Sequence, residues 1–312
     1  MKRGIGVYIG PKEVIAVSVS LSQGVPNLER FAIESLAETA EPHPSDSKEK
    51  DKPLKQAKKL TGEAGAVRRA LEKIGAQRMR VIAAFNPFHL VTRYFEIPII
   101  PRKEWWDAVR YEASRYIPFK ISETVVDFKI NEEVSRETNA KILCVTAAAV
   151  KIETLRSYVN HIRSSSAKVD TIEPVFLALS RSVALSEKLE NDKIYGFLFL
   201  DDDGSVNVTL SRSGVTYLSR DFLLSDDPKA NETRFYEELK VSIDFVQQKT
   251  GSDKIEKVFV AGSGDLPFWS DFLTSVFGKL ITFQPALFPV KQAVPSNILS
   301  KLMVPIGLAL SG

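Results

Sequence analysis

The chain has 312 residues, with 42 basic and 39 acidic side chains and a formal net charge of +3. This length allows about two domains and excludes a single small one. The nearly balanced charge disfavours nucleic acid or an acidic membrane surface as a partner. The single cysteine, Cys144, excludes disulfides within the chain, and its apolar surroundings predict a buried structural thiol.

No part of the sequence is typical of an export signal or a membrane span. The N-terminus is basic, but the apolar stretch after it is interrupted. The most apolar run, residues 194–200, is far shorter than the roughly 20 residues that a transmembrane helix needs. We therefore expect a soluble protein that reaches a membrane only through a partner.

The first part of the chain predicts strands, a polar loop, a helix and a further strand. Alternating apolar residues on either side of Gly10-Pro11 indicate a hairpin. Residues 38–60 are rich in Pro, Ser, Glu, Asp and Lys, which predicts a flexible loop. Helical spacing of apolar residues then follows from Ala66 to Ile74. The predicted strands cover residues 4–9, 13–21, 31–36 and 79–85.

The middle of the chain predicts a compact unit of strand, helix, strand and strand. Its strands are residues 90–97, 124–130 and 141–150, and its helix begins at Pro101 and ends at Pro118. The helix carries the aromatic stripe Trp105, Trp106 and Tyr116. We expect this stripe to pack in a core rather than to line a peptide groove, because helical apolar stripes usually face a core.

The second half repeats the pattern of the first. A strand at 169–172 and a helix from Pro174 lead into it, and residues 194–222 then predict antiparallel strands around Asp201–Gly204. Strand and helix patterns alternate after that. Because both halves open with antiparallel strands and close with strand-helix units, we expect a two-lobed α/β protein with a cleft between the lobes.

Two segments in the middle unit resemble a known family. They are Arg-Tyr-Phe-Glu-Ile-Pro-Ile-Ile-Pro at residues 93–101 and Val-Arg-Tyr-Glu-Ala-Ser-Arg-Tyr-Ile-Pro-Phe at residues 109–119, followed by Asp127. Together they resemble the inserted subdomain of the PilM family of type IV pilus assembly proteins. Similar segments recur in the same order almost to the end of the chain, at residues 169–181, 239–245, 258–264 and 306–310.

The resemblance implies an actin-like ATPase fold, related to the division protein FtsA and the cytoplasmic part of the secretion protein GspL. The first lobe would comprise residues 1–87 and 166–190. An inserted SHS2-like subdomain of strand, helix, strand and strand would comprise residues 88–165, and the second lobe residues 191–312. The class is therefore α/β, with two lobes and one insertion.

The resemblance also implies a function. A PilM-like chain would be a cytoplasmic scaffold, peripheral to the inner membrane, for a type IV pilus or a type II secretion-like machine. It would bind the cytoplasmic N-terminal tail of a PilN-like membrane protein and could also meet the pilus motor ATPase. The tail would lie in a groove between the inserted subdomain and the first lobe.

The first phosphate-binding hairpin of the family is altered in this sequence. Tyr8 stands where the family carries an aspartate, and Ile15 stands in place of its lysine. Pro11 removes an amide donor, and Glu13 adds negative charge near the expected phosphates. The sequence therefore predicts a degenerate nucleotide site and a pseudo-ATPase.

Other parts of a nucleotide site are retained, and each has a second interpretation. Asp202, Gly204 and Ser205 fit the second hairpin, although a run of aspartates is also common in a solvated turn. Gly262-Ser263-Gly264 is similar to the adenosine loop, although such glycines also serve ordinary turns. Glu173 is the one candidate catalytic carboxylate, and it could equally stabilise a helix N-terminus.

The main alternative is an actin-fold ATPase or small-molecule kinase that binds ATP with magnesium in the interlobe cleft. An FtsA-like filament-forming membrane tether ranks lower, because no amphipathic helix follows residues 306–310. His43, His89 and His161 are far apart in sequence, so we predict no metal site formed by the protein alone.

Overall fold

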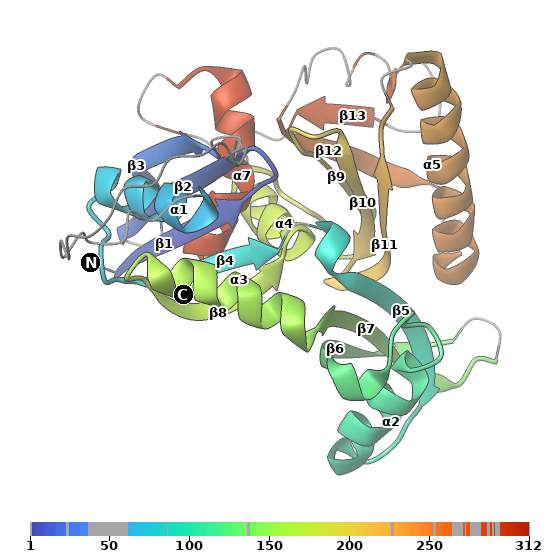
Figure 1. Ribbon diagram of the computed structural model, residues 1–312. Helices are drawn as coiled ribbons and strands as arrows, with labels where there is room; N and C mark the ends of the chain where they lie inside the picture. The colour runs from blue at the N-terminus through green and yellow to red at the C-terminus, as the bar shows by residue number, and fades with distance from the viewer. Residues whose placement is uncertain are drawn as a thin grey trace, which may run out of the picture.

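The computed structural model contains two lobes and a smaller third unit (Figure 1). It describes residues 2–22, 25–36, 62–85, 87–135, 138–225, 228–251, 254–263, 271, 273–274, 282–285, 288, 290 and 294–311. The predicted flexible loop at 38–60 and the site residue Gly264 lie outside these ranges.

The first lobe is built on a five-stranded sheet with the order β3-β2-β1-β4-β8. β1, β2 and β3 are antiparallel neighbours, whereas β1, β4 and β8 run parallel. The predicted hairpin is confirmed, and the third strand is longer than predicted because it begins at Val25. The strands are β1 (Lys2–Ile9), β2 (Glu13–Ser22), β3 (Val25–Ser35), β4 (Arg80–Phe85) and β8 (Lys168–Pro174).

The second lobe repeats the same topology, with the order β11-β10-β9-β12-β13. The central strand β9 is buried at every residue, as expected for a strand that is covered on both faces. This repeat confirms the predicted duplication. The elements are β9 (Ile194–Leu200), β10 (Ser205–Arg212), β11 (Val215–Leu223), α5 (Pro228–Thr250), β12 (Ile255–Gly262) and β13 (Thr282–Pro285).

The third unit is a separate antiparallel sheet with the order β5-β7-β6. It has its own core, in which Val109 and Ala113 of the helix meet Leu143 and Val145 of the central strand. The predicted limits 88–165 for an SHS2-like subdomain stay a prediction. The elements are η1 (Pro87–His89), β5 (Val91–Pro98), η2 (Arg102–Glu104), α2 (Trp105–Ala113), η3 (Ile121–Glu123), β6 (Thr124–Val134) and β7 (Lys141–Lys151).

The predicted burial of the aromatic stripe is wrong for two of its three residues. Trp106 is 48% exposed and Tyr116 is 45% exposed, whereas Trp105 is partly buried against the core of the third unit. The physical reason is that α2 ends at Ala113, not at Pro118, so Tyr116 no longer follows the helical spacing. Trp106 instead lies beside Phe128 at the edge of the core, with ring centroids 5.5 Å apart.

Two helices cover the outer face of the first sheet. α1 (Gly62–Lys73) places Val67 and Leu71 in the same cluster as Val7 of β1. α3 (Ile152–Ser164) adds Tyr158 and Ile162 to that cluster. The helix that follows the third unit in sequence therefore packs in the core of the first lobe (Figure 1).

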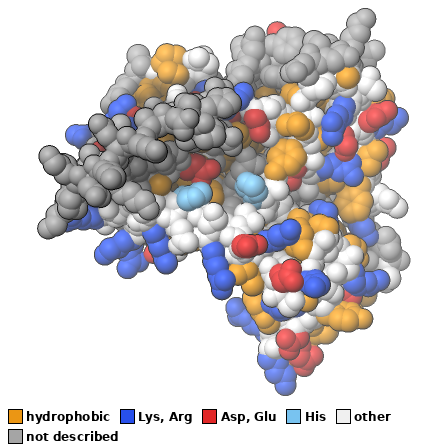
Figure 2. Space-filling view, viewed as in Figure 1, with side chains coloured by type: hydrophobic (Ala, Val, Ile, Leu, Met, Phe, Trp, Pro, Cys, Tyr) orange, Lys and Arg blue, Asp and Glu red, His pale blue; other side chains and the backbone are white. Residues whose placement is uncertain are grey.

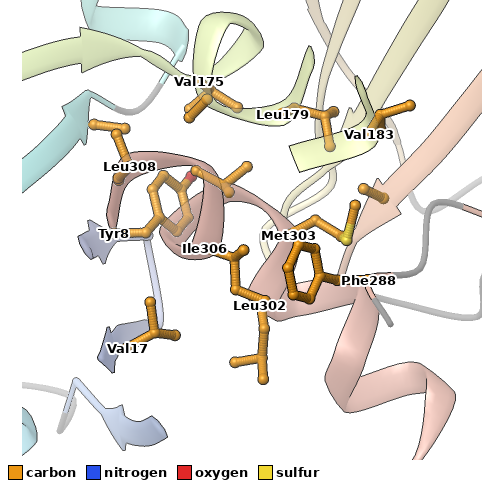
Figure 3. Packing of buried hydrophobic residues seen from close by; sticks show 14 of the residues in the cluster. Tyr8, Val17, Val175, Leu179, Val183, Phe288, Leu302, Met303, Ile306 and Leu308 are labelled. Atoms are coloured by element: carbon orange, nitrogen blue, oxygen red, sulfur yellow. The ribbon is translucent and has the colours of Figure 1, made fainter. Parts of the chain in front are cut away.

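The inner face of the first sheet packs against α4 (Val175–Ser186) and α7 (Ser296–Ala309). Figure 3 shows Leu179 of α4 above α7, with Met303 on α7 and Tyr8 beside it. The same cluster contains Phe197 of β9, so one apolar core joins both lobes. This shared core sets the positions of the strand ends that form the cleft.

Glycine allows α7 to approach its neighbours at backbone distance. A Cβ added to Gly307 would lie 1.8 Å from the carbonyl oxygen of Ala178 in α4. A Cβ added to Gly4 or Gly6 of β1 would lie 1.8 or 1.9 Å from carbonyl oxygens of α7. Backbone atoms on both sides leave no flexible side chain that could move aside.

We predict that Gly307→Ala lowers the free energy of unfolding by about 3 kcal/mol, because overpacking strains a filled core. Alanine normally stabilises a helix interior relative to glycine by about 1 kcal/mol, so the expected sign is the reverse of helix propensity. Urea unfolding followed by circular dichroism measures the change. The control is Asn297→Ala at an exposed position of α7, which should leave stability within about 0.5 kcal/mol. Equal stability of the Gly307 variant would contradict the close contact.

Candidate functional site

Three segments meet at the carboxyl ends of the central strands of the two sheets. They are the turn between β1 and β2, the turn between β9 and β10, and the end of β12. The sequence predicted nucleotide-binding residues in the second and third of these segments. The structure brings the three segments into direct contact, as the following bonds show.

A buried hydrogen bond joins the two central strands. The Tyr8 hydroxyl, at the end of β1, donates to Oδ2 of Asp201, directly after β9. Burial raises the pKa of Asp201 from 3.8 to about 7, although the bond from Tyr8 opposes this rise. Burial, reinforced by the nearby Asp201 carboxyl, also raises the pKa of Tyr8 well above its usual value. The Tyr8 hydroxyl therefore stays protonated, and the Asp201 carboxyl also takes up a proton as the pH falls below about 7.

Charged side chains extend this contact between the hairpins. Lys12 donates from its backbone N–H to Oδ1 of Asp202 over 3.2 Å and from Nζ to the Asp202 carbonyl over 2.7 Å. Nζ of Lys301, in α7, lies 2.9 and 3.1 Å from the two carboxylate oxygens of Glu13. The Ser263 hydroxyl also donates to Glu13, over 3.4 Å. Side chains of the protein itself thus bridge the first hairpin to both other segments.

Several backbone N–H groups of these segments have partners within the protein. In the first hairpin, Gly10 donates to the Glu13 carbonyl over 2.9 Å. In the second, Gly204 donates to the Asp201 carbonyl over 3.3 Å and Ser205 donates to Oδ1 of Asp203 over 2.8 Å.

The β12 end follows the same pattern. Gly262 donates to the Ser300 hydroxyl over 3.1 Å, and Ser263 donates to the Leu200 carbonyl over 2.8 Å. The donors in these bonds belong to the segments predicted as the second phosphate loop and the adenosine loop, of which Gly264 lies outside the described residues. The bonds engage the amides that the sequence comparison assigned to a ligand.

Glu173 lies at the end of β8, before α4, and is 8% exposed. Its Oε2 lies 3.0 Å from Nη1 of Arg181 in α4, and its Oε1 accepts a hydrogen bond from Ser311. Arg181 also donates to the Gly307 carbonyl over 2.7 Å. The structure therefore places Glu173 in an ion pair that ties α4 to α7. None of the bonds described for it involves the two hairpins.

A cavity with a volume of about 720 Å³ opens beside these hairpins. Its walls come from the turn at Gly10 and Pro11, the segment Phe88–His89, one side of α3 and the β9–β10 turn. Acidic and histidine side chains gather around a hollow in the middle of the molecular face in Figure 2. The cavity is thus a groove bounded by both lobes and by the start of the third unit.

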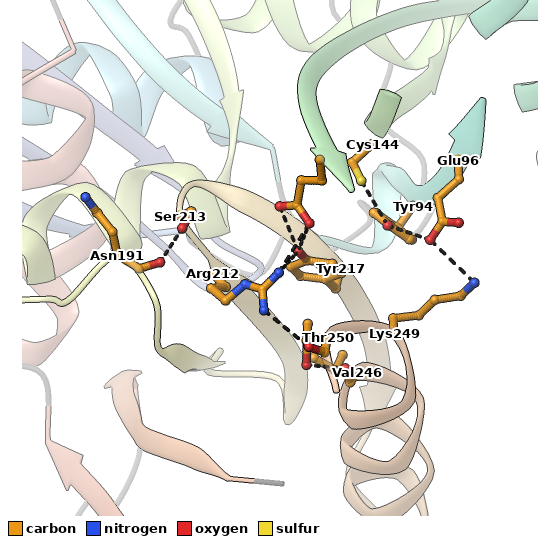
Figure 4. Close-up of polar contacts among 11 residues, drawn as sticks. Tyr94, Glu96, Cys144, Asn191, Arg212, Ser213, Tyr217, Val246, Lys249 and Thr250 are labelled. Carbon is orange, nitrogen blue, oxygen red and sulfur yellow. Dashed lines mark hydrogen bonds and ion pairs between the residues drawn. The ribbon is translucent and has the colours of Figure 1, made fainter. Parts of the chain in front are cut away.

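Polar contacts dock the third unit on the second lobe (Figure 4). Glu133 of β6 accepts from the Tyr217 hydroxyl over 2.8 Å and lies 3.2 Å from Nη2 of Arg212. Lys249 of α5 lies 3.4 Å from Glu96 of β5. The third unit is therefore bonded to the second lobe as well as connected in sequence to the first.

Cys144 lies at this same interface and is 2% exposed, which confirms the predicted burial. Its Sγ lies 3.3 Å from the Tyr94 hydroxyl. Burial raises the pKa of the Cys144 thiol to about 11, which keeps the thiol protonated. The residue packs with the core of the second lobe.

Sequence reasoning did not identify Lys12, Asp201 or Lys301 as site residues. Tyr8 and Glu13 were recognised only as departures from a phosphate-binding pattern. The signal in hindsight is their chemistry, because a buried phenol and a partly buried carboxylate each favour a hydrogen-bonding partner. Those partners lie 193 and 288 positions away in the chain, so local spacing could not pair them.

The searched, described residues contain no group of three or more His, Cys, Asp or Glu side chains arranged to hold a metal ion. Within the same ranges, no helix combines the length and the apolar character that a membrane crossing requires.

Two sheets of identical strand order, joined by a shared core with a cleft at their strand ends, define an actin-like fold. The family described as type IV pilus assembly protein PilM matches residues 6–211, and the chain belongs to this family. No curated protein matches the sequence.

Solved structures agree with this assignment. The structure described as the PilM-PilN type IV pilus biogenesis complex is 21% identical, with a TM-score of 0.76 over 99% of this chain and 98% of that chain. The cytoplasmic domain of EpsL, an inner-membrane component of the type II secretion system of Vibrio cholerae, is 13% identical. Its TM-score is 0.52 over 100% of this chain and 96% of that chain. At these identities the likeness shows a common fold.

We predict that Tyr8→Phe destabilises the protein more at pH 8.5 than at pH 5. Because burial raises the pKa of Asp201 to about 7, its carboxyl is protonated in the folded protein at pH 5 and ionised at pH 8.5. Losing a hydrogen bond to a charged group costs about 1.5 to 3 kcal/mol, against about 1 kcal/mol for a neutral one. Urea unfolding at the two pH values measures the difference.

The matched control is Tyr195→Phe, which removes a hydroxyl that accepts a 3.1 Å hydrogen bond from the Glu190 amide and contacts no carboxylate in the bonds described. Its cost should be the same at both pH values. Because the pKa of Asp201 is about 4 in the unfolded chain and about 7 in the folded protein, Asp201 lowers the stability of the protein as the pH rises from about 4 to about 7. This fall in stability should be absent from Asp201→Asn. A Tyr8 variant with no pH dependence would rule out the assigned bond.

Proposed function

We propose that this protein is a cytoplasmic scaffold in type IV pilus assembly that binds the cytoplasmic tail of a PilN-like inner-membrane protein, and that its interlobe cleft is a degenerate nucleotide site. The observation that carries this proposal is the direct bonding of the two hairpins to each other through Tyr8–Asp201 and Lys12–Asp202. In this arrangement the protein itself occupies the space between the hairpins.

The charges around the hairpins support a degenerate site. An actin-like cleft holds phosphates through backbone amides and a positive charge. Here the amides of Gly10, Lys12 and Ser205 bond within the protein. Nζ of Lys12 donates to the Asp202 carbonyl, and Lys301 forms an ion pair with Glu13. To bind here, a polyphosphate would have to break these bonds, and its negative charge would then face the released carboxylates. No described lysine or arginine lines the groove to offset this repulsion.

The groove supports peptide binding. Its volume of about 720 Å³ suits an extended segment of several residues, and its walls combine apolar and polar side chains. The match to a PilM-PilN complex makes a PilN-like tail the first candidate. We infer that the chain resides at the cytoplasmic face of the inner membrane through this partner, and that it could also contact the pilus motor ATPase.

The ATPase or kinase alternative depends on Glu173 as a catalytic carboxylate. The ion pair with Arg181 and the bond from Ser311 give this residue a structural role between α4 and α7. An essential Glu173 for ATP turnover, with folding intact, would favour the enzyme over the scaffold.

We predict that the purified chain binds the N-terminal tail peptide of a PilN-like protein, and that Ser157→Tyr weakens this binding at least tenfold. Ser157 lies on the wall of the groove, so a tyrosine there would occupy ligand space. A tenfold loss corresponds to about 1.4 kcal/mol. Isothermal titration calorimetry measures the affinity.

The control is Asn160→Tyr, which adds the same side chain at another exposed position of α3 that does not line the groove. It should bind like the unchanged protein. If neither the unchanged protein nor the control binds the tail peptide, the scaffold proposal is rejected.

We further predict that ATP with magnesium at millimolar concentration does not raise the melting temperature and does not change the tail affinity. A ligand that binds only the folded state at 100 times its dissociation constant would add about 2.7 kcal/mol of stability, which a thermal scan detects readily. A clear rise in melting temperature would show that the hairpins can open for nucleotide and would refute the degenerate site.

A further inference from the structure

The wall of the groove carries a charge pattern that the overall composition does not reveal. Glu63, Glu153 and Asp203 line it, together with His89 and His161. No lysine or arginine is among the described lining residues. The whole chain is slightly basic, so this acidic groove is a local feature of the tertiary structure.

Part of this charge is engaged within the protein. Oε2 of Glu63 lies 2.5 Å from Nδ1 of His161, and Oδ1 of Asp203 accepts the amide hydrogen of Ser205. Glu153 stands in the first turn of α3, where a carboxylate also suits the helix dipole. Glu153 comes from the first lobe and Asp203 from the second, so the two carboxylates border the groove from opposite lobes.

An unsatisfied hydroxyl gives independent support for a ligand. Ser205 lines the groove and is 2% exposed, yet its Oγ has no hydrogen-bond partner among the described residues. A buried hydroxyl without a partner is costly, and native structures seldom retain one without a reason. A ligand group that bonds this oxygen would remove the cost. The helix dipole at Glu153 and the β9–β10 turn account for the carboxylates but not for the missing partner of this hydroxyl.

The combination of carboxylates and a hydroxyl selects the charge of the ligand. Each of these oxygens can accept a hydrogen bond from an ammonium or guanidinium group. A phosphate would face carboxylates from both lobes, with no lysine or arginine among the described residues of the wall. The apolar side chains of Phe88 and Leu223, 48% and 47% exposed, offer contact surface for neighbouring aliphatic atoms.

We propose that the groove contains a subsite for a cationic group, the ammonium of a lysine or the guanidinium of an arginine, carried by an extended peptide segment. Glu153 and Asp203 bind the charge from the two lobes, and Ser205 accepts one of its hydrogen bonds. This inference rests on the proposed function, because it specifies the chemistry of the tail that the groove binds.

The test uses the full chain and two peptides: the PilN-like tail, and the same tail with each lysine replaced by norleucine and each arginine by citrulline. Binding is measured by titration calorimetry at 50 and 300 mM salt. We expect Glu153→Gln and Asp203→Asn each to weaken the cationic peptide about tenfold at low salt and less at high salt, because salt screens exposed charges. The neutral peptide should bind weakly and equally to all variants.

Two variants separate binding from folding. Ser205→Ala should retain full stability, because its hydroxyl has no partner to lose, and should still weaken the cationic peptide several-fold. Glu123→Gln, a matched change in the third unit at a side chain 65% exposed and outside the groove, should leave binding unchanged. Equal affinity of the cationic and neutral peptides, or of the Glu153 and Asp203 variants and the unchanged protein, would overturn the subsite.

If the tail does not bind the unchanged protein, the scaffold proposal fails and the subsite is tested separately. The probes are then N-acetyl-arginine amide and N-acetyl-citrulline amide, followed by NMR of the protein amides. The subsite predicts that the arginine probe shifts the amide signals of Asp203 and Ser205 and that the shift is lost in Glu153→Gln. No shift with the arginine probe, or the same shift with citrulline, would reject the subsite.

Discussion

The whole arrangement depends on the contact of α7 with β1 and α4 at backbone distance. Gly4, Gly6 and Gly307 make this contact possible, because a side chain at any of them would overlap a carbonyl group. α7 follows the second lobe in sequence, yet it packs on the first sheet and shares a core with Phe197 of β9. One helix therefore holds the two lobes at a fixed separation.

That fixed separation explains the state of the cleft. With the lobes held by one apolar core, the hairpin ends are close enough for Tyr8 to bond Asp201 and for Lys301 of α7 to pair with Glu13. Bonds from Glu133 and Glu96 to the second lobe attach the third unit to the same body. Side chains of this protein bridge the lobes at the hairpins, and an open groove lies beside them.

Local patterns predicted most strands and helices, because burial on one face imposes a period of two on strands and 3.6 on helices. The duplicated order of strands followed from these patterns together with the family resemblance. The patterns failed where an aromatic residue lies at the edge of a core. Trp106 and Tyr116 have the spacing of a buried stripe, but α2 ends before Tyr116, and whether a ring at such an edge is covered depends on which segments reach it.

The sequence by itself determined the class of fold and the family, and it predicted the loss of the lysine and the aspartate from the first hairpin. Each of these features is recognised from residues that lie close together along the chain. Only the tertiary structure decided what replaced them: the bonds of Tyr8 and Glu13 to partners 193 and 288 positions away, and the acidic groove beside them. The physical reason is that a hydrogen bond or a charged wall depends on distance in space, which the packing of α7 between the lobes sets and which no local pattern encodes.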